Sequence, residues 1–211
     1  MPSIQDAYDR WSRQYDSQEN CTRDLDAALL PELAPPLAGQ TVVEAGCGTG
    51  KNSQWLAAHC DRLIGLDFSA GMLRLAHQRV PVSHFHLVQG DVTAPWPLRG
   101  AVAGVVLFNL ILEHVAALEP VFRQAARVLK PGGQLFVSEY HPQRLAAGGG
   151  ATIAGEGGVV FGSYHNSEDD YLRALAAAGF HLDRIRSWSD APGTPPRLLT
   201  LHAALTAAST R

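Results

Sequence analysis

Residues 41–53 read TVVEAGCGTGKNS, a short apolar stretch that runs into a glycine-rich loop and then into polar residues. Glycines in such a loop let the backbone turn sharply and approach a ligand closely, because no Cβ stands in the way. The phosphate-binding P-loop pattern fails, since Ala45 stands at its first glycine and Asn52 at its metal-binding hydroxyl. The dinucleotide pattern fits poorly, since Lys51 stands at its third glycine. The loop therefore predicts a ligand site that lacks a phosphate clamp.

Outward from this loop, the apolar pattern alternates between strand and helix periods, which is typical of βα units. We expect strands over 41–45, 62–67, 84–91, 102–110 and 134–140, and two more near 181–187 and 198–204. Helices are expected over 51–60, 69–79 and 118–129, and a further one from the cap residue Ser167 to Gly179. The KPGG loop at 130–133 should end the third helix. This order predicts one α/β domain over 1–211 with a doubly wound, mostly parallel sheet.

Acidic residues follow two of the predicted strands. Asp67 ends the second strand and is suited to accept hydrogen bonds from both hydroxyls of a ribose. Asp91 ends the third strand, where it would accept from the exocyclic amine of adenine, or serve only as a turn residue after Gly90. Ligands of doubly wound sheets lie at the carboxyl ends of the strands, so we expect both acids beside the glycine loop.

Composition excludes several classes of function. A net charge of -3, with Lys51 and Lys130 as the only lysines, gives no basic footprint for nucleic acid. The chain has no apolar run of the roughly 20 residues that a membrane helix needs, and its N-terminus lacks the apolar core of a signal peptide. Its three cysteines are far apart, and its nine histidines show no metal-ligand spacing. We expect a cytoplasmic protein with reduced thiols, no bound metal and no membrane partner.

Taken together, these motifs resemble those of class I S-adenosylmethionine (SAM) dependent methyltransferases, nearest to the small-molecule branch called methyltransferase type 11 or UbiE-like. The resemblance covers about residues 8–139. Its motifs are VVEAGCGTG, LIGLDFSAGML, LVQGDV, VVLFNLILEHV and VLKPGGQLFVSEY. It implies a Rossmann-like seven-stranded sheet whose last strand is antiparallel, a helical cover over 1–35, a cofactor-binding core over 41–139 and a variable substrate lid over 140–165.

The resemblance also implies SAM as the cofactor and gives its binding residues. The glycines of the loop would line the methionine and ribose, Asp67 would bind the ribose hydroxyls, and Asn109 would lie near the methionine amino group. Aromatic and apolar side chains would pack the adenine, whose edge Asp91 and the Val92 backbone would read. The full predicted set is Tyr15, Glu44, Gly46, Gly48, Gly50, Asp67, Phe68, Met72, Asp91, Val92 and Asn109.

Some of these positions allow a plainer interpretation. Glu44 would equally brace the glycine loop, and Phe68 and Met72 would equally be ordinary core residues. For Trp55 we expect a place in the core. His84 and His86 alternate along the third strand, which favours a shared solvated face over a ligand pair.

The acceptor side follows less directly from the sequence. Methyl transfer from a sulfonium mainly requires alignment of the nucleophile, and a base only where the nucleophile carries a proton. The candidate catalytic residues are His114, His141, Tyr164 and His165, with Glu139 and Tyr140 as further candidates. Each also has an interpretation as a surface or packing residue. The glycine-rich stretch 146–163 is expected to form a lid loop or a short hairpin.

The hypothesis is a SAM-dependent methyltransferase that acts at O or N of a small-molecule acceptor, as a monomer or homodimer. Two alternatives stay open. Another sulfonium carbon of SAM could be attacked, as in aminocarboxypropyl transfer or cyclisation of the SAM side chain. The chain could also be a SAM-binding module without catalysis.

Overall fold

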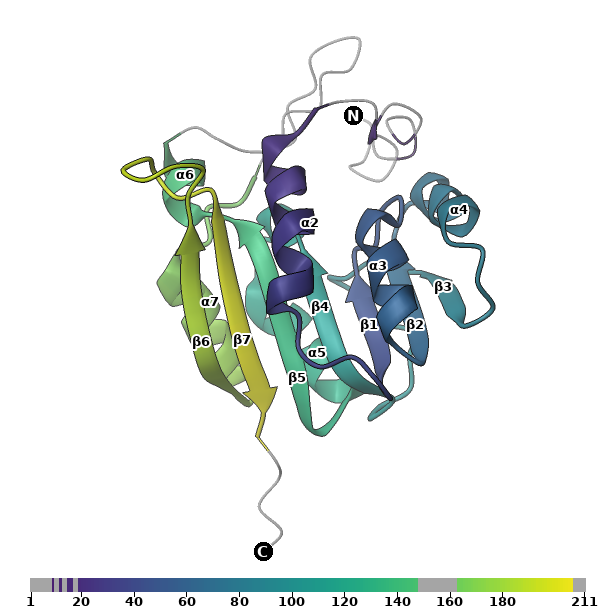
Figure 1. Cartoon of the computed structure of the whole chain (residues 1–211). Helices are drawn as coiled ribbons and strands as arrows, with labels where there is room; N and C mark the ends of the chain where they lie inside the picture. The colour runs from purple at the N-terminus through teal and green to yellow at the C-terminus, as the bar shows by residue number, and fades with distance from the viewer. Residues whose placement is uncertain (1–8, 10–11, 13–14, 17–18, 148–162, 207–211) are drawn as a thin grey trace, which may run out of the picture.

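The computed structural model describes residues 9, 12, 15–16, 19–147 and 163–206. At its centre is a seven-stranded sheet in the order β3-β2-β1-β4-β5-β7-β6 (Figure 1). The strands are β1 (Thr41–Ala45), β2 (Arg62–Asp67), β3 (Phe85–Gln89), β4 (Ala103–Asn109), β5 (Leu129–Tyr140), β6 (Phe180–Trp188) and β7 (Leu198–Leu205). β7 pairs antiparallel with both β5 and β6, whereas β1 to β5 pair in parallel. The predicted fold class, a seven-stranded and mostly parallel sheet whose last strand is antiparallel, is confirmed.

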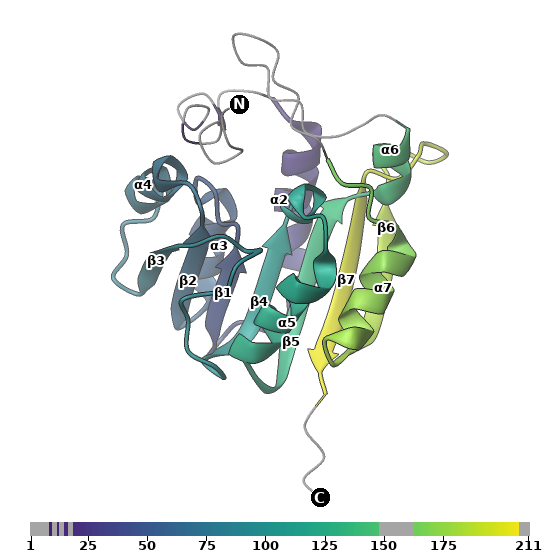
Figure 2. The same ribbon diagram turned by 180° about the vertical axis from the view of Figure 1, so that it is seen from behind.

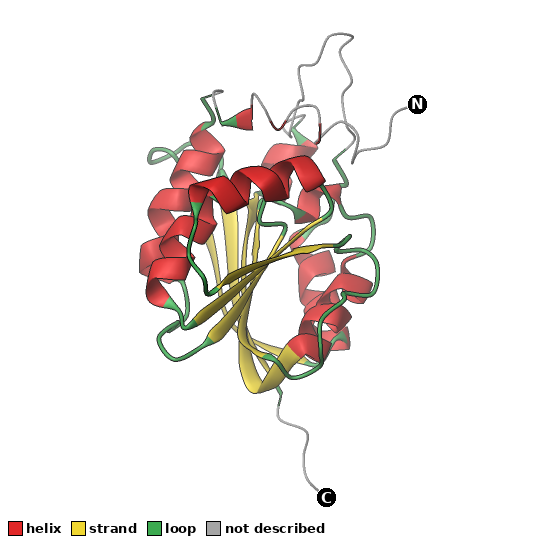
Figure 3. Cartoon of the chain, turned by 90° about the vertical axis from the view of Figure 1, so that its right-hand side faces the viewer, coloured by secondary structure: helices red, strands yellow, loops and turns green. Residues whose placement is uncertain are grey.

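Helices cover both faces of the sheet, as the views from behind and from the side show (Figures 2 and 3). One face carries α2 (Cys21–Leu33), α3 (Lys51–His59) and α4 (Ala70–Arg79). The other carries α5 (Leu118–Val128) and α7 (Glu168–Ala177). A one-turn helix η1 (Leu112–His114) follows β4, and α6 (Pro142–Ala146) follows β5.

Each face of the sheet has its own apolar core. On the α5 and α7 side, Phe108 of β4 packs edge-on against Phe122 of α5, with their ring centroids 5.9 Å apart. On the other side, Leu30 of α2 and Leu56 of α3 are buried together against strand residues such as Val42. β4 has core residues on both faces, which explains why its sequence is continuously apolar.

The predicted helix caps are confirmed. Ser69 accepts a hydrogen bond from the Met72 amide at the start of α4. Ser167 and Asp170 form a capping box at the start of α7, and Gly179 after α7 has a φ of +87°. These signals work because they satisfy backbone groups locally, whatever the helix packs against.

One prediction near β5 needs correction. The strand begins at Leu129, the last residue of the helix expected over 118–129, and includes the segment 130–133 expected to be a loop, because Leu129 already pairs with Ala103 across an irregular stretch of the ladder. Residues 142–146, expected within the variable lid, form the short helix α6, whose first turn Pro142 favours. Most of the predicted glycine-rich lid, 148–162, and part of the N-terminal cover lie outside the described residues. Within the described part of the chain, no helix is long and apolar enough to cross a membrane.

Candidate functional site

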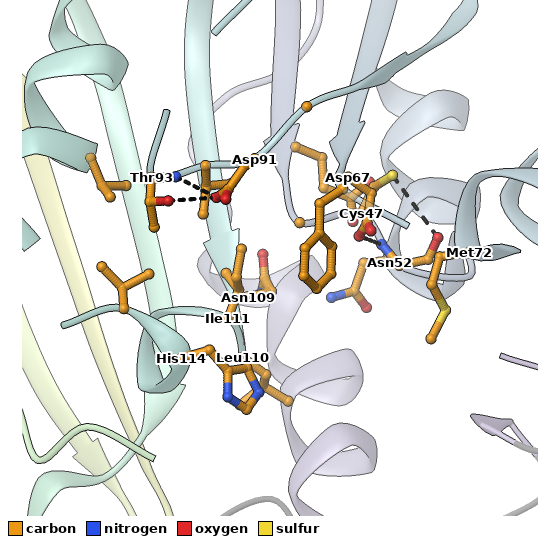
Figure 4. A pocket seen from close by; sticks show the side chains of 18 of the residues that line it. Cys47, Asn52, Asp67, Met72, Asp91, Thr93, Asn109, Leu110, Ile111 and His114 are labelled. Carbon is orange, nitrogen blue, oxygen red and sulfur yellow. Dashed lines mark hydrogen bonds between the residues drawn. The ribbon is translucent and has the colours of Figure 1, made fainter. Parts of the chain in front are cut away.

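A pocket of about 510 Å³ lies at the carboxyl ends of the central strands (Figure 4). It brings together the ends of β1, β2 and β4, the turn after β3 and part of α2. Of the predicted cofactor residues, those that line it are Tyr15, Glu44, Gly46, Gly48, Asp67, Phe68, Met72, Asp91, Val92 and Asn109. Segments far apart in sequence thus meet at one site, as the parallel topology predicts.

The glycine loop forms the floor of this pocket. Gly46, Gly48 and Gly50 have φ values of +79°, +53° and +79°, a region that side chains strongly disfavour. The amides of Gly46 and Cys47 both donate to the Leu66 carbonyl, at 2.7 and 3.1 Å, which fixes the loop to β2. A Cβ on Gly46 would lie 2.4 Å from Ile111 Cδ1, so a larger residue there would need the Ile111 side chain to shift as well as a positive φ.

Gly50 has a different place from the one predicted. It is absent from the described pocket lining and is the N-cap of α3, where a Cβ would lie 3.0 Å from the Ala76 Cα of α4. Its glycine is needed for the turn and for the close approach of two helices. The spacing of the glycines in the sequence does not reveal this role, because only the packed structure shows that a Cβ on Gly50 would face α4.

Asp67 connects the glycine loop to the start of α4. Its Oδ2 accepts from the Gly48 amide and its Oδ1 from the Ser69 amide, both at 2.9 Å. Burial raises the pKa of this carboxyl to about 6, while the two amide donors act in the opposite direction. Each carboxylate oxygen has a further lone pair, so Asp67 can still accept from a ligand in the pocket.

Glu44 braces the site from below. It is 3% exposed, and its Oε2 accepts a hydrogen bond from Ser53 Oγ on α3. Burial raises the pKa of Glu44 to about 8, so the side chain is largely a neutral acid near pH 7. Glu44 also lines the pocket, so the bracing role and contact with a ligand are compatible.

Asp91 begins a tight turn after β3. Its Oδ1 accepts from the Thr93 amide at 2.8 Å and from Thr93 Oγ1 at 2.7 Å, as the dashed lines in Figure 4 show. This is the turn role that the sequence left open for this residue. The turn also places Asp91 and Val92 on the wall of the pocket.

A buried aspartate that the sequence analysis missed lies at the pocket's inner end. Asp26 of α2 is 3% exposed and accepts from Asn52 Nδ2 and from Asn109 Nδ2, both at 2.9 Å. Burial raises its pKa. A signal was present, because Asp26 occupies the buried stripe of α2 at helical spacing from Thr22 and Leu30.

Asn109 is the best indication of what this inner end binds. With Nδ2 donated to Asp26, its Oδ1 is buried and accepts no hydrogen bond within the described part of the chain. A buried acceptor left in this state is costly and fits a ligand that brings a donor. The two hydrogen-bond acceptors, Asn109 Oδ1 and the Asp26 carboxylate, suit an ammonium group, which is a donor.

Two cations also line the pocket, and both are engaged by other groups. Lys51 Nζ lies 2.8 Å from Asp24 Oδ1 on α2. Arg23 donates to the Tyr15 carbonyl at 2.8 Å, and its guanidinium carbon lies 4.2 Å from the centre of the Tyr15 ring. Both side chains are therefore held by groups of the protein itself.

Only some of the predicted catalytic residues line the pocket. His114 and Tyr164 line the pocket, and Tyr164 is 49% exposed. Burial lowers the pKa of His114, although neighbouring Glu113 acts in the opposite direction, so its imidazole is neutral at pH 7. His165 is exposed and is absent from the described lining.

His141 is placed away from the pocket. Its side chain is fully buried, and its Nδ1 accepts from the Gln143 amide at the start of α6. Its Nε2 lies 3.1 Å from Ser187 Oγ on β6. The ring therefore anchors α6 to the sheet, and it does not belong to the described pocket lining. Tyr140 is half-buried and Glu139 fully buried, and neither belongs to the described lining.

Comparison with known proteins gives the class to which this architecture belongs. The sequence profile of the Methyltransferase domain family matches residues 43–137, which hold the glycine loop and most of the predicted motifs. An uncharacterized methyltransferase of Emericella nidulans is 30% identical over 220 aligned positions, which cover 84% of this chain and 75% of that protein. A malonyl-[acyl-carrier protein] O-methyltransferase of Methylovorus is 30% identical over 84% of this chain, but this match spans only 63% of the relative's own length.

Solved structures share the fold. A structure of a SAM-dependent methyltransferase from Mesorhizobium loti aligns with a TM-score of 0.73, 22% identity and coverage of 84% of this chain and 96% of that chain. The geranyl diphosphate C-methyltransferase of Streptomyces coelicolor, solved with S-adenosyl-L-homocysteine, aligns with a TM-score of 0.68 and 17% identity over 87% of this chain and 79% of that chain.

This sheet, with a pocket at its strand ends, has the fold of solved SAM-dependent methyltransferases. The chain belongs to the methyltransferase family. The prediction of a methyltransferase is confirmed, and solved SAM-dependent methyltransferases share its fold.

Proposed function

We propose that this chain transfers a methyl group from SAM to an oxygen or nitrogen of a small-molecule acceptor by in-line displacement. The proposal is carried by two hydrogen-bond acceptors that line the same pocket. Asn109 Oδ1 lies at its inner end, and the Asp67 carboxylate lies at the end of β2. SAM has an ammonium group and a ribose diol, and both bring donors.

The pocket residues fit this cofactor. Asn109 and Asp26 would hold the amino group, and Asp67 the ribose hydroxyls. Phe68 and Met72 would flank the adenine, with Asp91 and Val92 at its edge. The glycine loop would lie along the methionine and ribose, where Gly46 and Gly48 offer bare backbone.

When bound, SAM supplies a methyl group on a positively charged sulfur, which is already activated for displacement. The protein's part is then to align the acceptor and exclude water. The neutral imidazole of His114 would accept a proton from an acceptor hydroxyl or ammonium, and Tyr164 would contact the acceptor at the mouth of the pocket. The names of several relatives support a small acceptor, among them a trans-aconitate 2-methyltransferase of Paracidovorax citrulli, 34% identical over 54% of this chain.

The first test is isothermal titration calorimetry with SAM, S-adenosylhomocysteine and NAD. We expect binding of both sulfur nucleosides and none of NAD. Binding of NAD alone would overturn the proposal and indicate an oxidoreductase. A second step incubates the enzyme with SAM and pools of small acceptors, followed by mass spectrometry. A gain of one methyl group together with S-adenosylhomocysteine would support the proposed reaction, whereas methylthioadenosine would indicate attack at another sulfonium carbon.

A further inference from the structure

Glu139 near the end of β5 is fully buried but does not belong to the described pocket lining. Its Oε1 accepts two backbone hydrogen bonds, from the Ile111 and Leu112 amides, both at 2.9 Å. These amides begin η1, the turn that ends at His114. One carboxyl oxygen of β5 therefore holds the start of the turn that follows β4.

This turn is under backbone strain. Leu110 has a φ of +55°, a region that non-glycine residues seldom occupy. Its amide donates to the Ser138 carbonyl at 2.9 Å, next to Glu139 on the same strand. Such a conformation persists only where its surroundings enforce it. Ser138 and Glu139 together supply that enforcement for residues 110–112.

The far end of the turn is held separately. Asn166, just before α7, donates from Nδ2 to the Val115 carbonyl at 2.9 Å. The Tyr164 amide donates to the Glu113 carbonyl at 2.7 Å. Between these anchors lie Ile111 and His114, which both line the pocket, and Ile111 also fills the space above Gly46. Loss of the Glu139 hydrogen bonds would thus displace both Ile111, which packs on the glycine loop, and His114.

We infer that Glu139 is a positioning residue, which fixes the strained 110–114 turn so that Ile111 packs on the glycine loop and His114 faces the acceptor. Only the statement that His114 faces an acceptor rests on the proposed function. The hold of Glu139 on the turn does not. Glu139 itself touches no ligand. It acts through the two backbone amides that it binds.

The protonation state of Glu139 allows a sharp choice of variants. Burial raises its pKa to about 8, against the lowering effect of its two amide donors, so it is mainly a neutral acid near pH 7. Glutamine keeps the acceptor oxygen and the shape, so Glu139→Gln should preserve the turn. Glu139→Met keeps the volume but removes the acceptor.

The test compares these variants with Val137→Ala by amide hydrogen exchange and histidine titration in NMR. Val137 is buried on the same face of β5, and its truncation should lower global stability without touching the turn. In Glu139→Met, exchange at Ile111 and Leu112 should rise about tenfold relative to the β4 amides, because each loses its acceptor. The pKa of His114 should move back towards its ordinary value. Glu139→Gln should stay within about threefold of the wild type for exchange at both amides.

Calorimetry of S-adenosylhomocysteine binding tests the proposed function separately from the positioning role of Glu139. Glu139→Met should weaken it more than Val137→Ala, and Glu139→Gln should leave it nearly unchanged. If the wild type binds no S-adenosylhomocysteine, the proposed function fails while the exchange result still decides the role of Glu139. Turn amides in Glu139→Met that stay as protected as in Val137→Ala, with an unshifted His114, would overturn the inference.

Discussion

Asp26 and Asn109 are 83 positions apart in sequence, yet Asp26 Oδ1 accepts a hydrogen bond from Asn109 Nδ2 at 2.9 Å. The bond ties helix α2 to the end of β4. It also sets the orientation of the Asn109 amide, because the nitrogen must face Asp26 and the oxygen must face elsewhere. The buried Asn109 Oδ1 is therefore an acceptor that the N-terminal helix has prepared.

The first prediction concerns this pair. Asp26→Ala should lower the free energy of unfolding by about 1–3 kcal/mol, because the Asn52 and Asn109 amides lose their acceptor. It should also weaken SAM binding, since Asn109 becomes free to rotate. The matched control is Asp24→Ala on the same helix, which removes an exposed ion pair with Lys51 and should cost less stability than Asp26→Ala. Calorimetry and urea unfolding measure both effects, and equal losses in the two variants would contradict the prediction.

Asp67→Ala should weaken SAM binding by about 10- to 100-fold, the range expected when a hydrogen-bonding carboxylate is removed. The Gly48 and Ser69 amides would lose their acceptor as well, so a modest loss of stability is expected. Circular dichroism should still show the native fold. Asp183→Ala, an exposed carboxylate on β6, is the control for charge and should bind SAM like the wild type. Unchanged SAM affinity in Asp67→Ala would remove Asp67 from the site.

Alanine substitutions at Gly46 and Gly39 distinguish the cost of backbone strain from the cost of a steric collision. Both have φ near +75° to +79°, but a Cβ on Gly39 would meet nothing within 4 Å, whereas one on Gly46 would collide with Ile111. Gly39→Ala should cost about 1–2 kcal/mol, from strain alone. Gly46→Ala should cost more and should weaken SAM binding. Thermal unfolding with and without SAM measures this, and equal costs would mean that Ile111 moves aside freely.

Stability should fall as pH rises from 6 to 8.5. Burial raises the pKa of Glu44 to about 8 from its ordinary value of 4.5, so the folded chain holds a proton that the unfolded chain has released. This contribution is complete below about pH 4.5 and is lost as pH rises through about 8. We expect urea unfolding to give a free energy at least about 1 kcal/mol lower at pH 8.5 than at pH 6.

The control for this pH dependence is a pair of glutamine variants. Glu44→Gln should make the profile shallower, because it removes one titrating carboxyl but keeps its shape, while Glu139, whose pKa burial also raises to about 8, still contributes. Glu119→Gln, at an exposed position of α5, should leave the profile unchanged. A wild-type profile that is flat between the two pH values would show that Glu44 is ionised in the folded state.

Most of the architecture followed from local signals. The strand 62–67 and the caps at Ser69 and Ser167 were predicted correctly, because apolar period and side-chain capping act within a few residues. The start of β5 was not, since Leu129 joins the sheet through its partner Ala103, which the local pattern of residues 129–133 does not reveal. Of the candidate site, the residues predicted from strand ends were brought together, whereas His141 was not.

By itself, the sequence determined the βα order, the glycine loop and the acids that close the strands, because each depends on short-range backbone geometry and apolar periodicity. Only the tertiary structure decided how those groups are used. It turned Gly50 towards α4 and His141 into the anchor of α6, and it placed Asp26 against Asn109 and Glu139 beneath the 110–114 turn. These roles depend on which distant backbone and side-chain groups must share a buried hydrogen bond, and that is settled only when the sheet and its helices are packed.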